Sequence, residues 1–83
     1  PSPFRQATLL RFYLRHEAPV RMRIYDSGGA LVRTLLDERF PPGRHEASWD
    51  GRDQRGASVN SGVYYLQFLA DGENVRRKVI RIR

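Results

Sequence analysis

Apolar and polar residues alternate with a period of two along most of the chain. The alternation is clearest between residues 18 and 25, where Val20, Met22 and Ile24 are separated by Arg21 and Arg23. Because successive side chains of a β-strand point to opposite faces of a sheet, this period predicts strands with one buried and one solvated face. No window has the period of an α-helix longer than one turn. The alternation predicts strands at residues 8–14, 18–25, 30–36, 44–49, 63–70 and 75–83.

Glycine, proline and aspartate separate the predicted strands. Residues 26–29 and 71–74 combine aspartate with glycine, which accepts positive φ angles, so we expect each segment to close a β-hairpin. Pro41 and Pro42 cannot donate to a strand ladder, so residues 40–43 should cross an edge or connect two sheets. Residues 50–62 are polar and contain several glycines, which predicts a loop with at most a short strand within it.

Short strands separated by turn residues predict an all-β fold. We expect an immunoglobulin-like antiparallel β-sandwich of six or seven strands in two sheets, formed as one domain. The alternating apolar positions should form its core, which consists of Leu10, Phe12, Val20, Met22, Ile24, Val32, Leu35, Trp49, Tyr64, Leu66, Phe68 and Ile80.

The chain is short and strongly basic. A chain of 83 residues buries only about 60% of the surface that it exposes when unfolded, which leaves little room for a catalytic cleft. The net charge of +6 includes fourteen arginines and a single lysine. Such a charge fits either a polyanion-binding surface or a solvated sheet face. We favour the solvated face and expect no nucleic-acid partner, because the arginines mostly alternate with core positions, as at Arg11, Arg21, Arg23 and Arg33.

No set of residues indicates catalysis or a metal centre. The chain has no cysteine, and His16 and His45 have no third metal ligand near them in the sequence. A nucleophile needs a base that is oriented by a third group, and no such set is present. We therefore expect a protein that is not an enzyme and that holds neither a metal nor a cofactor.

The loop at residues 50–56 has two alternative interpretations. Its two carboxylates are the ligand type that calcium prefers, but its two arginines oppose a bound cation. The structural alternative is that Asp50 and Asp53 close Asx-turns while Gly51 and Gly56 adopt positive φ angles. We favour the structural interpretation.

Three aromatic residues could form a sugar-binding platform. Trp49 ends an alternating strand and is the only tryptophan, and in β-sandwiches such a residue usually fills the core. Tyr64 and Tyr65 are consecutive, so they face opposite sides of a sheet and cannot form one flat surface. A core position is therefore favoured for Trp49.

Several segments together resemble type IX secretion C-terminal sorting domains. The resemblance rests on a Pro-Phe start, a Y-D-x-x-G turn, a G-x-H segment, a W-D-G-x-D loop, an S-G-x-Y strand start and a basic-then-apolar last strand. The Ig-like domain of flagellar hook-capping proteins shares the Y-D-x-x-G and W-D-G-x-D parts. Ser2 departs from the pattern, because the sorting family usually has Asn there. The matching structural residues are Phe4, Tyr25, Asp26, Gly29, Gly43, Trp49, Asp50, Gly51, Asp53 and Gly56.

The resemblance implies that the chain is a sorting signal for secretion. Residues 1–83 would form one C-terminal sorting domain, cut from a longer exported protein of a Bacteroidetes-like bacterium. Its partners would be the outer-membrane secretion machinery and an N-terminal cargo domain in the same chain. The cargo, typically a hydrolase, would pass through the periplasm and be secreted or attached to the cell surface. We expect a monomer that does not insert into the membrane, since its apolar runs are short.

The last strand is the candidate recognition element. We hypothesise that residues 75–83 form an edge strand with open hydrogen-bonding groups, guarded by Arg76, Arg77, Lys78, Arg81 and Arg83. A receptor would read this strand by strand addition, with the basic side chains selecting the partner. The alternative is that the strand lies inside a sheet and that its charges only increase solubility. The candidate sorting residues, of which the first two would fix the fold that presents the strand, are Gly62, Tyr64, Arg77, Lys78, Val79, Ile80 and Arg81. Two alternative functions are a structural or adhesive Ig-like spacer and a carbohydrate-binding appendage.

Overall fold

The structure, a computed structural model, describes residues 3–4 and 7–83, so Ser2 lies outside the described residues. It contains six β-strands and, in the described ranges, no helix. The predicted all-β sandwich is confirmed. Within residues 3–4 and 7–83, no helix is long and apolar enough to cross a membrane. The strands are β1 (Thr8–Leu14), β2 (Ala18–Asp26), β3 (Leu31–Phe40), β4 (Gly43–Trp49), β5 (Gly62–Ala70) and β6 (Glu73–Arg81).

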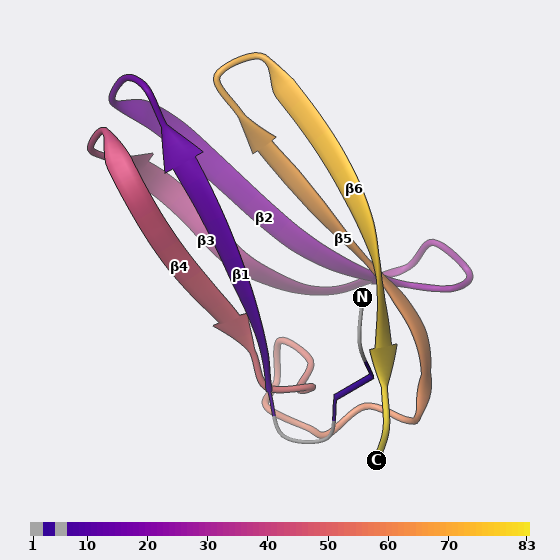
Figure 1. Cartoon of the computed structure of the whole chain (residues 1–83). Coiled ribbons are helices and arrows are strands. Elements are labelled where there is room, and N and C mark those ends of the chain that lie inside the picture. Colours follow the sequence, from indigo (N-terminus) through magenta and orange to yellow (C-terminus); the bar gives the residue numbers. More distant parts are fainter. Residues whose placement is uncertain (1–2, 5–6) are drawn as a thin grey trace.

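The strands form two antiparallel sheets of unequal size. β1 pairs with β4, and the larger sheet has the order β3-β2-β5-β6. In Figure 1, β1 and β4 lie in front of β2 and β3, whereas the β5–β6 hairpin extends beyond them. The small sheet therefore covers only part of the inner face of the large one.

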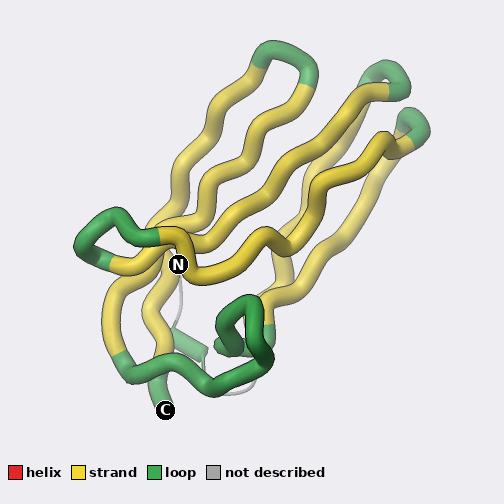
Figure 2. Tube along the Cα trace, turned by 180° about the vertical axis from the view of Figure 1, so that it is seen from behind, coloured by secondary structure: helices red, strands yellow, loops and turns green. Residues whose placement is uncertain are grey.

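The connections gather at the two ends of an elongated molecule of 37 × 21 × 21 Å. Figure 2 shows the three connections β1–β2, β3–β4 and β5–β6 at one end. The β2–β3 turn, the long loop between β4 and β5, and the C-terminus lie toward the other end. The Pro41-Pro42 segment joins the large sheet to the small one, which confirms the predicted connection between sheets.

β3 is longer than the sequence predicted. Its alternation ends near Leu36, yet pairing with β2 continues to Phe40, which lies opposite Ala18. Asp37, Glu38 and Arg39 are exposed, so no apolar side chain signals this part of the strand. Register shifts between β2 and β3 further obscure the period of two.

The core lies between the sheets and is centred on four fully buried side chains: Val20, Met22, Ile24 and Trp49. Most of the predicted core is confirmed, because Tyr64 and Leu66 are buried, and the remaining apolar positions except Ile80 pack against the buried clusters. The sequence did not predict five further buried apolar residues, which are Phe4, Leu14, Ala18, Ala70 and Val79.

The prediction that Ile80 belongs to the core is wrong. Tyr64 faces the core and lies opposite Val79, whereas Ile80 lies opposite Val63. Val79 is 3% exposed, and Ile80 is half-buried on the outer face. Because Val79 and Ile80 are consecutive apolar residues, the alternation does not show which of them faces the core. Only the register of β6 against β5 decides which of the two is buried.

A candidate recognition edge beside an open groove

A tight turn places β6 at the border of the large sheet. Asp71 and Gly72 have φ angles of 51° and 79°, which is the geometry that two-residue hairpins favour and that Asp-Gly provides. β6 begins at Glu73, two residues earlier than predicted, and ends at Arg81. Its pairing with β5 is uninterrupted from Glu73 to Arg81. In the described part of the chain, β6 is therefore an edge strand.

One short bridge covers the C-terminal end of this edge. The Phe4 N–H donates to the Ile80 carbonyl at 3.0 Å, and the Ile82 N–H donates to the Phe4 carbonyl at 2.8 Å. The Ile80 carbonyl and the Ile82 N–H thus point away from β5. Because these groups alternate in direction along a strand, Arg76 and Lys78 also present their backbone N–H and C=O groups at the edge.

The side chains along β6 carry unequal roles. Arg76 and Lys78 are exposed on the outer face of the sheet, and the Arg76 guanidinium lies 4.9 Å from the ring centroid of Tyr65. Arg77 lies opposite the buried Leu66, so it belongs to the inner face, yet it is exposed. Among the ion pairs of the described residues, none includes Arg76, Arg77 or Lys78.

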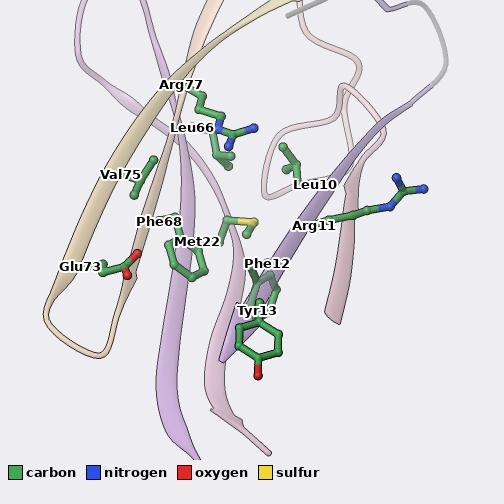
Figure 3. A pocket seen from close by; sticks show the side chains of 10 residues that line it. All are labelled: Leu10, Arg11, Phe12, Tyr13, Met22, Leu66, Phe68, Glu73, Val75 and Arg77. Atoms are coloured by element: carbon green, nitrogen blue, oxygen red, sulfur yellow. The ribbon is translucent and has the colours of Figure 1, made fainter. Parts of the chain in front are cut away.

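A groove lies beside the edge, between β1 and the β5–β6 hairpin. Its volume is about 180 Å³, and its walls combine apolar side chains with the charged side chains of Arg11, Glu73 and Arg77. Figure 3 shows Leu10 and Phe12 of β1 across from the β5–β6 side chains, with the Arg77 guanidinium reaching over Leu66. We use "groove" for the space that is lined by Leu10, Arg11, Phe12, Tyr13, Met22, Leu66, Phe68, Glu73, Val75 and Arg77.

Arg81 does not guard the edge as an exposed charge, so this part of the hypothesis is wrong. It is 6% exposed, on the inner face, and donates to the Ser58 Oγ at 3.0 Å. Its guanidinium lies 5.5 Å from the ring centroid of Phe4. A Cβ atom at Gly51, where φ is 75°, would overlap the Arg81 side chain. Gly51 is therefore required both by its backbone angle and by this close approach.

The two Asp-x-x-Gly segments fold as the same turn. Asp53 Oδ1 accepts from the N–H groups of Arg55 and Ala57, and the Asp53 carbonyl accepts from Gly56 at 3.0 Å. Asp26 makes the equivalent bonds two, three and four residues ahead. Gly29 and Gly56 have φ angles of 90° and 91°.

Asp50 also has a structural role in this loop. Its Oδ1 accepts from the Arg52 N–H at 3.1 Å and from the Arg33 guanidinium at 3.0 Å. These bonds, with those of Asp53, confirm the predicted Asx-turns. In the described residues, no group of three or more histidine, aspartate or glutamate side chains is arranged to hold a metal ion.

Trp49 and Tyr64 are internal, as predicted. Their ring centroids are 5.3 Å apart, the Trp49 Nε1 donates to the Arg52 carbonyl at 2.9 Å, and the Tyr64 hydroxyl donates to the Asn60 carbonyl at 2.7 Å. Burial, followed by the charge of Asp26, raises the pKa of Tyr64 above its usual value. Tyr65 lies on the opposite face, so these three rings form no common sugar platform.

The remaining candidate residues have structural surroundings. The His45 Nε2 lies 2.7 Å from the Pro41 carbonyl, and its ring packs against Phe12 and Phe40. Gly43 has a φ angle of 117° at the start of β4. Tyr25 lies opposite Tyr65 on the outer face of the large sheet, and Gly62 opens β5.

The structure brings the candidate sorting residues together only in part. Arg77 reaches the groove, Lys78 and Ile80 lie on the outer face, and Val79 and Arg81 belong to the inner, buried side. Sequence reasoning missed the groove and the Phe4 bridge. A groove between strands leaves no local pattern, and the resemblance named Phe4 as a structural residue without indicating that it bridges to β6.

Comparisons with known proteins agree with this fold. The model of the FlgD Ig-like domain family matches residues 3–74. The crystal structure of dimeric latent PorU from Porphyromonas gingivalis is similar over 99% of this chain, with 22% identity and a TM-score of 0.78. A crystal structure of FlgD from P. aeruginosa is similar over 87%, with 22% identity and a TM-score of 0.62. The chain spans only 9% and 57% of those two chains. None of the curated proteins matches the chain.

Proposed function

Because the chain belongs to the FlgD Ig-like domain family, we propose that it is a non-catalytic recognition module that directs a cargo protein through type IX secretion to the cell surface. The observation that carries this proposal is the basic edge strand β6. The family match ends at residue 74, so it does not include the exposed bases of β6. Support for sorting therefore comes from the last strand itself and from its resemblance to sorting domains.

The proposed mechanism is recognition by strand addition. The cargo would precede residues 1–83 in the same polypeptide, and the outer-membrane secretion machinery would bind the free edge of β6. Backbone hydrogen bonds would supply affinity, and the exposed bases Arg76, Arg77 and Lys78 would select the partner by charge. The buried residues Trp49, Tyr64 and Arg81 would hold the sandwich that presents this strand.

A reporter fusion tests the proposal. Residues 1–83 are placed after a folded periplasmic reporter in a bacterium that has type IX secretion, and surface or medium reporter is measured. We expect the reporter outside the cell only when both the domain and the secretion system are present. Reporter that stays in the periplasm would contradict the proposal.

The choice of variant decides what the fusion experiment shows. Deletion of residues 80–83 removes Arg81 together with the Phe4 bridge, so lost export would also follow from unfolding. The double charge reversal Arg76→Glu with Lys78→Glu changes only exposed side chains. We expect this variant to stay folded and to lose export, whereas a folded variant that is exported normally would exclude the basic edge as the signal.

A structural spacer is the second candidate function. The match to the FlgD Ig-like domain family over residues 3–74 favours it, because those residues build most of the sandwich without requiring an exposed signal. A spacer role predicts that a reporter fusion remains in the periplasm. It also predicts that the Arg76 and Lys78 reversals have no effect on the location of the natural parent protein.

A further inference from the structure

We propose that the groove and the free edge of β6 bind one extended segment of a partner protein in which apolar residues alternate with acidic residues. This inference deepens the proposed function, because it rests on β6 as the recognition element and names the chemistry of its partner. The backbone, the inner side chains and the outer side chains of the hairpin each supply one part of the argument.

The backbone of β6 provides the hydrogen bonds for an added strand. The Phe4 bridge occupies the Ile80 carbonyl and the Ile82 N–H, at the C-terminal end of the strand. Between Glu73 and Val79, none of the described residues pairs with the free edge of β6, which is the edge away from β5. A segment of about five residues would fill this length and bond to Arg76 and Lys78.

The groove accounts for the apolar residues of the proposed partner segment. A strand added to β6 continues the large sheet, so every second side chain of that strand points into the groove. There it meets Val75 and Phe68 on one side and Leu10 and Phe12 on the other (Figure 3). These four side chains are only partly buried in the chain alone. Apolar side chains of the partner would complete this part of the sandwich core.

The outer face of the large sheet accounts for the acidic residues of the proposed partner segment. The intervening side chains of the added strand would lie beside Arg76 and Lys78, and opposite charges on adjacent strands are stabilising. Other arginines already have carboxylate partners, as in the pairs Arg21–Asp37 and Arg39–Glu17. The ion pairs of the described residues do not include Arg76 or Lys78, so these two bases would select acidic residues.

A second copy of the chain fits this site less well than an acidic segment. Pairing two β6 strands would bring Arg76 and Lys78 of both copies to one outer face, where like charges repel. The net charge of +6 adds a long-range repulsion between copies. Charge complementarity therefore favours a distinct, acidic partner strand.

Synthetic peptides test the proposal directly on the 83-residue chain. The probe is a capped peptide with the core Val-Glu-Val-Glu-Val-Glu-Val, labelled for fluorescence anisotropy. One control replaces each Val by Ser, and a second keeps the composition but groups all Val before all Glu. We expect saturable binding of the alternating probe and at least about tenfold weaker binding of both controls, since each loses most of the apolar contact. Equal binding of the Ser control would overturn the proposal, as would no binding of the probe.

Charge variants with equal net charge locate the site. Arg76→Glu with Lys78→Glu should weaken binding of the alternating probe by about tenfold or more. The matched control is Arg15→Glu with Arg44→Glu, which reverses two exposed arginines away from β6 and should leave binding unchanged. Equal loss in both variants would mean that only net charge matters, and this would overturn the proposal.

The outcomes separate this inference from the proposed function. Peptide binding needs no secretion system, so export of a reporter without peptide binding would leave the sorting function intact and reject the acidic strand. Binding without export would keep the strand site and reject sorting. Sedimentation velocity provides a third measurement. Dimerisation of the chain without binding of the peptide would reject the acidic strand and assign the free edge of β6 to a second copy of the chain.

Discussion

Trp49 and Val75 both face the inside of the sandwich, but they lie in regions of opposite character. Trp49 is fully buried, contacts the rings of Phe4 and Tyr64, and has its Nε1 hydrogen-bonded. Val75 is only partly buried and lines the groove, which lies between it and Leu10 and Phe12 of β1. The region around Trp49, which we call the sealed end, is closed to solvent. The inner face of the β5–β6 hairpin is only half covered.

This difference separates the packing that stabilises the fold from the surface that we propose for recognition. The small sheet has two strands and the large sheet has four, so part of the apolar inner face of the large sheet remains exposed. The sealed end supplies the packing that holds the fold, while the open edge of β6 keeps backbone groups and bases available. Regions of low local stability are the usual places for binding. A change in one region should therefore leave the other largely unaffected.

The largest effect is expected from Trp49→Ala. Removing a fully buried tryptophan leaves a cavity between Phe4 and Tyr64, and such changes destabilise proteins by about 3–5 kcal/mol. Urea denaturation measures the free energy of unfolding. The control Tyr13→Ala removes an aromatic ring that is 66% exposed and should change stability by less than about 0.5 kcal/mol. Similar losses for both variants would contradict the contrast between sealed and open regions.

A smaller loss is expected from Gly51→Ala. Gly51 and Gly56 both have positive φ angles, so alanine costs about 1 kcal/mol at either site through the backbone. Only at Gly51 would the added Cβ collide with the buried Arg81, which adds about 1–3 kcal/mol. Comparing the two variants by thermal denaturation isolates this contact. Equal destabilisation would show that Arg81 does not pack against Gly51.

Tyr64→Phe should have a moderate effect that depends on pH. Burial raises the pKa of Tyr64 in the folded state above the ordinary tyrosine value of 10.0, so the folded chain keeps this proton after the unfolded chain has lost it. The free energy of unfolding should therefore fall as the pH rises above 10, and Tyr64→Phe should make this decline shallower. At neutral pH the variant loses the bond to the Asn60 carbonyl, about 1 kcal/mol. Denaturation curves across pH 8–11 provide the measurement, and identical pH slopes would contradict the prediction.

The smallest effect on stability is expected at the open edge. Arg76→Glu with Lys78→Glu alters exposed side chains that form no ion pair with the described residues. The change also removes the contact of the Arg76 guanidinium with the Tyr65 ring, so stability should change by less than about 1 kcal/mol. The same variant should lose peptide binding and reporter export. A large drop in melting temperature would mean that the bases of β6 help to hold the fold.

Sequence reasoning predicted much of the fold because this fold depends on local alternation. The strand β1 was predicted with its observed bounds, and Val20, Met22 and Ile24 were placed correctly in the core. Asp53 and Gly56 were likewise identified as turn residues, because their chemistry specifies the turn by itself.

The site was harder to predict because it depends on register and on contacts between distant segments. Val79 and Ile80 exchange faces according to their pairing with β5, which no local pattern records. Arg81 was taken for an exposed base, since its burial depends on Gly51, Phe4 and Ser58, which come from other parts of the chain. The candidate edge was predicted as a strand, but the groove beside it arises only from the unequal size of the two sheets.

Amide hydrogen exchange along β6, followed by NMR, measures whether the edge of this strand is open. We expect the N–H groups of Arg76 and Lys78 to exchange rapidly, whereas those of Arg77 and Val79, which point toward β5, should be protected. Adding the alternating Val-Glu peptide should protect Arg76 and Lys78 and leave the amide of Trp49 unchanged. Protection of Arg76 and Lys78 in the chain alone, or no added protection when the peptide is saturating, would contradict an open recognition edge.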